Sequence, residues 1–134
     1  TRRCKGDTMF TRGVVVLGLV LGAHSAVAQT PEIQAWHRRC NAGDMAACGM
    51  TGMAYEMGLG VARNDTLAAQ LYRRACDGGL MNGCLLLASM YRGGRGVAQS
   101  DTLAVTLFQR ACEGGSRQAC DSMRVPLTRP KPPH

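Results

Sequence analysis

The stretch "ACDGGLMNGC" at residues 75–84 returns as "ACEGGSRQAC" at residues 111–120, and this repetition decides the fold. Each copy places two cysteines eight positions apart, with a glycine pair between them. When residues 55–84 are compared with residues 91–120, 16 of 30 positions are identical. A catalytic centre needs to be built only once, whereas a fixed period of this length is typical of stacked supersecondary units.

One repeat unit has the pattern of two helices. Apolar and small residues return on one helical face over residues 67–75 and again over residues 103–111. N-cap residues precede these helices (Asn64-Asp65 and Ser100-Asp101), and glycine pairs suited to a left-handed turn follow them (Gly78-Gly79 and Gly114-Gly115). The partner helices, residues 46–57 and 81–92, end at "GLGV" and "GRGV". The sequence therefore predicts an all-α fold, a short right-handed α/α solenoid of antiparallel helix pairs that resembles tetratricopeptide proteins.

The ends of the repeat region, residues 29–124, are incomplete units. Trp36 occupies the position of Tyr72 and Phe108, so residues 31–40 are expected to form a shortened opening helix. The last helix is expected to reach Arg124 and to stop before the proline-rich tail at residues 125–134.

The segment before the repeats has the pattern of an export signal. Met9 is the first plausible initiator, so residues 1–8 are interpreted as a misplaced start. Residues 9–28 contain Arg12, an apolar run over residues 14–22 and an A-x-A site at residues 26–28, which is the arrangement of a secretory signal peptide. The run is shorter than the roughly 20 residues that a spanning helix needs. We expect export to the periplasm or beyond, with no stable membrane insertion after cleavage.

Six cysteines follow the predicted signal, and an even set in an exported chain indicates disulfides. The first cysteine of each pair closes one helix and the second opens the next, so both lie side by side across a helical hairpin. Each bond is expected to contribute roughly 2–3 kcal/mol by restricting the unfolded chain. Zinc would need C-x₂₋₄-C clusters and redox catalysis a C-x-x-C pair, and the six cysteines have neither spacing. The predicted bonds are Cys40–Cys48, Cys76–Cys84 and Cys112–Cys120.

The stretches "LYRRACDGGLMNGC", "MYRGGRGV" and "LFQRACEGGSRQAC" resemble the Sel-one-like repeat family, in particular its cysteine-rich, Hcp-type exported branch. The resemblance covers about residues 31–124. It implies an α/α solenoid with one disulfide per helical hairpin and a role in protein or ligand interaction. It also implies penicillin binding and slow β-lactam hydrolysis as a possible activity, although this chain has only two complete repeats.

The residues themselves show no catalytic constellation, so no catalytic residue, metal or cofactor is predicted. The part of the chain after residue 28 lacks S-x-x-K and K-T-G motifs, and His37 aligns with Arg73 and Gln109 on a polar helix face. The formal net charge is +7, but no basic tract with interleaved aromatics indicates nucleic-acid binding. The alternatives kept open are a weak β-lactamase, suggested only by the resemblance, and a Cu(I)-binding protein.

The copper hypothesis depends on Met50, Met53 and Met57, which stand at i, i+3 and i+7 on one helix face. Thioethers suit Cu(I), but methionine also fills irregular apolar surfaces, which is the favoured interpretation.

The favoured function is a scaffold that binds an unknown protein or peptide. Positions that differ between the two repeats form one helix stripe, and residues freed from packing are those that face solvent or a partner. The candidate binding strip consists of Met53, Glu56, Leu85, Ser89 and Arg92.

Overall fold

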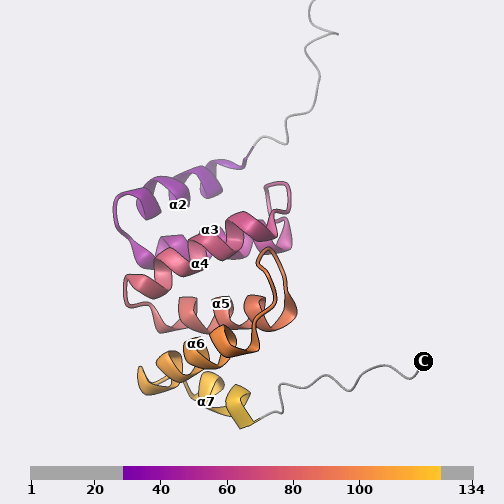
Figure 1. Cartoon of the computed structure of the whole chain (residues 1–134). Coiled ribbons are helices and arrows are strands. Elements are labelled where there is room, and N and C mark those ends of the chain that lie inside the picture. Colours follow the sequence, from indigo (N-terminus) through magenta and orange to yellow (C-terminus); the bar gives the residue numbers. More distant parts are fainter. Residues whose placement is uncertain (1–28, 125–134) are drawn as a thin grey trace, which may run out of the picture.

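A computed structural model describes residues 29–124 of the chain. Its described part consists of helices with no strand, and consecutive helices pack against each other along the whole series. Figure 1 shows them stacked from α2 at one end to α7 at the other. The helices are α2 (Pro31–Asn41), α3 (Met45–Met57), α4 (Asp65–Asp77), α5 (Met81–Gly93), α6 (Asp101–Glu113) and α7 (Arg117–Arg124). The predicted α/α repeat fold is confirmed, while the interpretations of residues 1–28 and 125–134 fall outside the described residues.

The helix ends follow the local sequence. Asn64 and Ser100 accept hydrogen bonds from the backbone N–H groups of the third residues after them, which confirms both predicted N-caps. Gly58 and Gly94 end α3 and α5 in the left-handed region, with φ of 69° and 63°. A side chain with a Cβ is strained in this conformation, so glycine allows the sharp reversal there. The observed helices differ from the predicted ranges by one residue at single ends.

Three disulfides join the cysteines as predicted. Their Cα atoms lie 4.6 Å apart in Cys40–Cys48, 4.5 Å in Cys76–Cys84 and 4.8 Å in Cys112–Cys120. Each bond crosses the short turn between two antiparallel helices, where the first cysteine ends one helix and the second lies in the first turn of the next. The bonds therefore fix the α2–α3, α4–α5 and α6–α7 hairpins.

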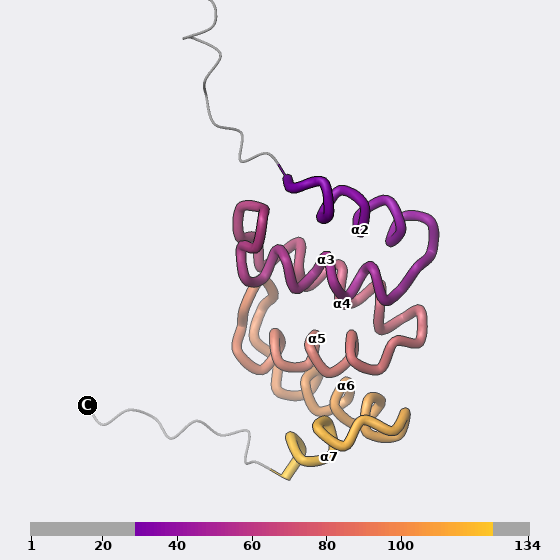
Figure 2. Tube along the Cα trace, turned by 180° about the vertical axis from the view of Figure 1, so that it is seen from behind, coloured from indigo at the N-terminus to yellow at the C-terminus, as the bar shows by residue number. Residues whose placement is uncertain are grey.

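The buried residues form two clusters along the stack of helices, whose order from α2 to α7 can be followed along the chain in Figure 2. One cluster contains Tyr72 and buried residues of α2 to α5, and a second contains Phe108 and buried residues of α4 to α7. Both aromatic side chains are fully buried. Gly83 allows α5 to approach α4 closely, because a Cβ on it would lie 2.8 Å from the Cβ of Ala75. Among the described residues, no helix is long and apolar enough to cross a membrane.

Candidate functional site: a methionine-lined groove between α2 and α3

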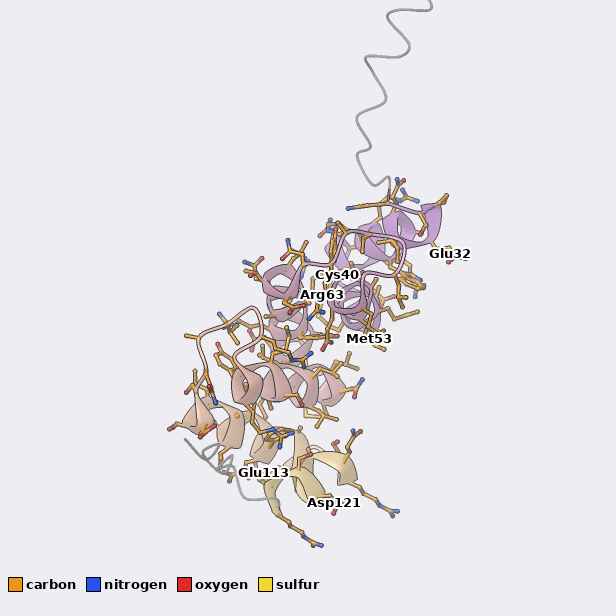
Figure 3. All side chains as sticks on the ribbon, turned by 90° about the vertical axis from the view of Figure 1, so that its right-hand side faces the viewer. Glu32, Cys40, Met53, Arg63, Glu113 and Asp121 are labelled. Carbon is orange, nitrogen blue, oxygen red and sulfur yellow. A yellow bond between two sulfur atoms is a disulfide. The ribbon has the colours of Figure 1, made fainter. Side chains whose placement is uncertain are left out.

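An apolar groove of about 370 Å³ lies at the N-terminal end of the stack, between α2, α3 and the turn after α3. Figure 3 shows Glu32 of α2 and Met53 of α3 on the same side of the molecule. Most of the lining is apolar, and Thr30 and Glu32 are its polar side chains. The lining residues are Thr30, Glu32, Ile33, Trp36, Met50, Met53, Ala54, Met57, Leu59 and Gly60.

The groove contains the main concentration of exposed large apolar side chains among the described residues. Met50, Met53 and Met57 are 41%, 39% and 53% exposed, and Leu59 in the following turn is 56% exposed. The methionines stand at i, i+3 and i+7, so α3 presents them as one stripe. A contiguous exposed apolar patch of this kind is typical of an interaction site.

Backbone and side-chain hydrogen bonds fix the edge of the groove. The Thr30 N–H donates to the Gly60 carbonyl oxygen at 3.1 Å, and the Gln29 side-chain amide donates to the Tyr55 hydroxyl at 2.7 Å. Gly60 has a φ of 66°, and a Cβ on it would lie 2.8 Å from the Thr30 side chain. Glycine is therefore required at this turn, and the entrance of α2 is held against the end of α3.

The 36-residue period identifies the residues of the next repeat that correspond to the lining of the groove. Trp36 aligns with Tyr72, and Leu59 aligns with Arg95. At this second position α3 itself lies over the aromatic ring: a Cβ on Gly52 would come within 2.7 Å of the Tyr72 ring. Glu56 of α3 accepts hydrogen bonds from the Tyr72 hydroxyl at 2.6 Å and from Arg95 at 2.5 Å.

The same arrangement returns a second time, with α5 in place of α3. Phe108 aligns with Tyr72, and Ala88 and Arg92 of α5 align with Gly52 and Glu56. Ala88 is fully buried in the Phe108 cluster, and the Arg92 guanidinium carbon lies 5.0 Å from the centroid of the Phe108 ring. We call each such surface, an aromatic side chain with the neighbouring helix and turn, a helix seat. The seats at Tyr72 and Phe108 are filled, whereas no described helix covers the seat at Trp36.

The opposite end of the stack is polar. Asp121 of α7 aligns with Leu85 and Gly49, both of which are buried, yet its own side chain is 73% exposed. A terminal repeat with a polar outer face closes a solenoid toward solvent. In the described part of the chain, α7 carries the exposed Asp121 beside Met123, which is 37% exposed, whereas the groove at α2 is lined mainly by apolar side chains.

Charges lie mainly away from the groove. The Ala47 backbone N–H, followed by the Arg39 guanidinium, holds the pKa of Asp44 below its ordinary value at the start of α3. Burial, reinforced by the Glu56 carboxylate, raises the pKa of Tyr72 and keeps its hydroxyl protonated. Among the described residues, no cluster of three histidine, cysteine or acidic side chains could hold a metal ion. The groove therefore offers shape and apolar contact rather than acid–base chemistry.

The five residues of the candidate binding strip occupy different environments. Leu85 is 5% exposed and belongs to the core, so the expectation that it faces a partner is corrected. Glu56 and Arg92 contact the aromatic side chains of the filled seats, and the Ser89 hydroxyl donates to the Leu85 carbonyl oxygen. Met53 alone among the five lines the groove.

Sequence reasoning overlooked most of the groove, although one signal for it was present. Trp36 aligns with Tyr72 and Phe108, so the sequence indicates an aromatic residue in the first unit that a helix could cover. Leu59, which stands where the next repeat has Arg95, also indicated that the first seat has a different chemistry.

The fold and the open groove define a short, disulfide-bonded α/α repeat protein. More specifically, the chain belongs to the Sel1 repeat family, whose model matches residues 46–80 and 82–116. The structure of cysteine rich protein B from Helicobacter pylori is similar, with a TM-score of 0.67, 32% identity and coverage of 78% of each chain.

Two longer proteins are also similar. A protective antigen of uropathogenic Escherichia coli with an SLR fold has a TM-score of 0.63 and 37% identity, over 65% of this chain and 19% of that one. A Sel1 repeat protein from Oxalobacter formigenes has a TM-score of 0.65 and 28% identity, over 66% of this chain and 26% of that one. No curated protein sequence matches the chain.

Proposed function

We propose that this protein is an exported, disulfide-stabilised interaction module that binds a segment of another protein in the groove between α2 and α3. Repeat proteins of this type bind other proteins. The observation that carries the proposal is the open helix seat at Trp36. The molecule buries the corresponding aromatic residues, Tyr72 and Phe108, under its own helices.

Export is supported by two independent features. Three disulfides form and persist in an oxidising compartment such as the periplasm or the extracellular space. Residues 9–28 also have the three-part pattern of a secretory leader.

The groove has the composition of a protein-binding surface. Methionine side chains are flexible and polarizable, so Met50, Met53 and Met57 can adapt to the shape of an apolar partner. Trp36 adds a large aromatic surface with one polar N–H, a residue type enriched at the energetic centres of interfaces.

A photo-crosslinking amino acid at position 53 tests this proposal in cells that express the protein. The control carries the same group in place of Val105, which is 36% exposed on α6, away from the groove. A discrete adduct from position 53 that is absent from position 105 and lost with Leu59→Arg is the expected result. Equal adducts from both positions, or none from position 53, would contradict it.

Cu(I) binding is the second candidate, because the structure places three methionine side chains along the same groove. We rank it below protein binding because Ile33, Trp36 and Leu59, which supply no metal ligand, form much of the remaining lining. Titration with Ag(I) as a Cu(I) substitute separates the two. One tightly bound ion that is lost with Met50→Leu and Met53→Leu would favour the metal site.

A further inference from the structure

We infer that the partner places a single α-helix in this groove, with a glycine against Trp36 and an apolar residue four positions later against Leu59. The helix runs antiparallel to α2 and takes the place that α3 takes over α4. This inference rests on the proposed function and specifies the chemistry of the partner.

The occupant is a helix because the surface repeats a helix-binding surface. In the second unit Tyr72 and the turn at Arg95 hold α3 through Glu56, and in the third unit Phe108 packs against Ala88 and Arg92 of α5. The first unit offers the same elements, α2, α3 and the turn at Leu59, with the same spacing in sequence. A helix supplied by another protein would therefore extend the stack by one element, in the manner of a helix that lies in an apolar groove.

A small residue is required where the helix crosses the aromatic ring. Gly52 crosses Tyr72 so closely that a Cβ would lie 2.7 Å from a ring carbon, and Ala88 is the buried counterpart at Phe108. Trp36 is the largest of the three aromatic residues, so the partner helix needs its smallest residue, glycine, at this position.

The residue four positions later is determined by charge complementarity. In the second seat this residue is Glu56, whose carboxylate is bonded to both the Tyr72 hydroxyl and Arg95. In the first seat Trp36 and Leu59 replace these partners, so neither the hydroxyl nor the guanidinium is present. An acidic side chain would lose its hydration beside Leu59 and would enter a groove that already contains the Glu32 carboxylate, whereas an apolar side chain matches Leu59.

The described helices of a second copy do not meet these requirements. The two helices that fill seats, α3 and α5, are already packed within their own chain and carry Glu56 and Arg92 at the position in question. No helix within residues 29–124 meets these requirements, and we assign the groove to a different protein that presents an amphipathic helix with Gly-x-x-x-apolar on one face.

A peptide copied from α3 provides a defined probe. The first peptide spans residues 44–58 with Cys48→Ser and Glu56→Leu, the second retains Glu56, and the third adds Thr51→Pro to the first. Trp36 is the only tryptophan of the chain and lines the groove, so its emission in the full-length oxidised protein reports binding directly. The peptides contain no tryptophan.

We expect the Glu56→Leu peptide to shift the Trp36 emission to the blue and to bind at least tenfold more tightly than the peptide with Glu56. The proline peptide should not bind, because proline removes a helical hydrogen bond and kinks the helix. Leu59→Arg in the protein should reverse the preference in favour of Glu56, because it recreates the environment of Arg95. Leu103→Arg is the matched control, since Leu103 is 46% exposed on α6 and should leave both affinities unchanged.

Several results would overturn the inference. Equal binding of the proline peptide would mean an extended ligand, so the helix would be wrong while the proposed function stands. A Trp36 emission that is already blue-shifted and insensitive to all peptides would mean that another segment of the chain fills the groove. A dimer in sedimentation that Leu59→Arg dissociates would identify a second copy as the occupant. Absence of any peptide response together with absence of crosslinking from position 53 would reject the proposed function as well.

Discussion

The contributions of the three disulfides to stability can be compared directly, because all three close loops of the same length. We consider removal of one bond at a time by paired Cys→Ala substitution, with Cys4→Ala in every chain to prevent mispairing. Each bond joins residues eight positions apart. The chain-entropy relation gives about 2.6 kcal/mol at 25 °C for a loop of this size, and it is the same for all three. Any difference between the variants must therefore come from the folded state.

Burial predicts the direction of that difference. Cys76 and Cys84 are fully buried at the centre of the stack, whereas Cys112 and Cys120 are half-buried beside the short terminal helix α7. Alanine at the central pair leaves unfilled space that adds about 1–2 kcal/mol to the loss. We expect the free energy of unfolding to fall by about 4 kcal/mol for Cys76–Cys84 and by about 2.6 kcal/mol for Cys112–Cys120. Against a typical stability of about 5–15 kcal/mol, this loss would leave the central variant marginally folded if the parent chain lies at the lower end of that range.

Urea unfolding followed by far-ultraviolet circular dichroism measures these losses, with the free energy extrapolated linearly to water. In a thermal scan the Cys112–Cys120 variant should melt about 10–20 °C below the parent chain. A terminal variant that is destabilised as much as the central one, or more, would refute the reasoning. It would mean that burial of the sulfur atoms adds nothing to the entropy of loop closure.

Four further outcomes can be checked separately. Gly52→Ala should cost about 1–3 kcal/mol in urea unfolding because its Cβ meets the Tyr72 ring, whereas Gly93→Ala, with contacts no closer than 3.5 Å, should not destabilise. Glu56→Ala should cost about 2–3 kcal/mol because the buried Tyr72 hydroxyl loses its acceptor; a loss below roughly 0.5 kcal/mol, which is about the error of the measurement, would contradict this. The lowered pKa of Asp44 stabilises the fold above the unfolded value of about 4, and this contribution is lost as pH falls through the lower folded value. Acid titration should therefore destabilise the parent chain more than Asp44→Asn. The oxidised chain should hydrolyse a chromogenic cephalosporin no faster than its reduced and alkylated form, and turnover that follows the folded fraction would establish an enzyme instead.

The repeated elements of the fold could be predicted from the sequence because their local signals agree. Asn64 and Ser100 precede helices with the same apolar face, and paired glycines follow both helices. The cysteine pairing followed from the same regularity, since each pair stands at the ends of helices joined by a short turn. Local preferences and packing favour the same structure at these positions.

The candidate site could be predicted only in part, because divergence between repeats is not a reliable sign of exposure. Glu56 and Arg92 differ in charge, yet both contact the aromatic residue of the next unit. They diverge because Tyr72 offers a hydroxyl to a carboxylate, whereas Phe108 offers only a ring face, which attracts a guanidinium. The sequence shows the two substitutions but not the contact that couples them, so the strip combined interior residues with the exposed Met53.

This coupling supports the proposal that the end of the stack at α2 binds the partner. Neighbouring units pack through an aromatic residue of one unit and a side chain of the preceding helix that contacts it. The forces that build the solenoid are therefore also able to bind a helix of another protein. At α7 an exposed Asp121 stands where earlier units bury Gly49 or Leu85. At α2 the aromatic residue is present but the helix that should cover it is absent from the described chain. Recognition at Trp36 therefore uses the same packing that holds the fold together, with Leu59 determining which helix fits.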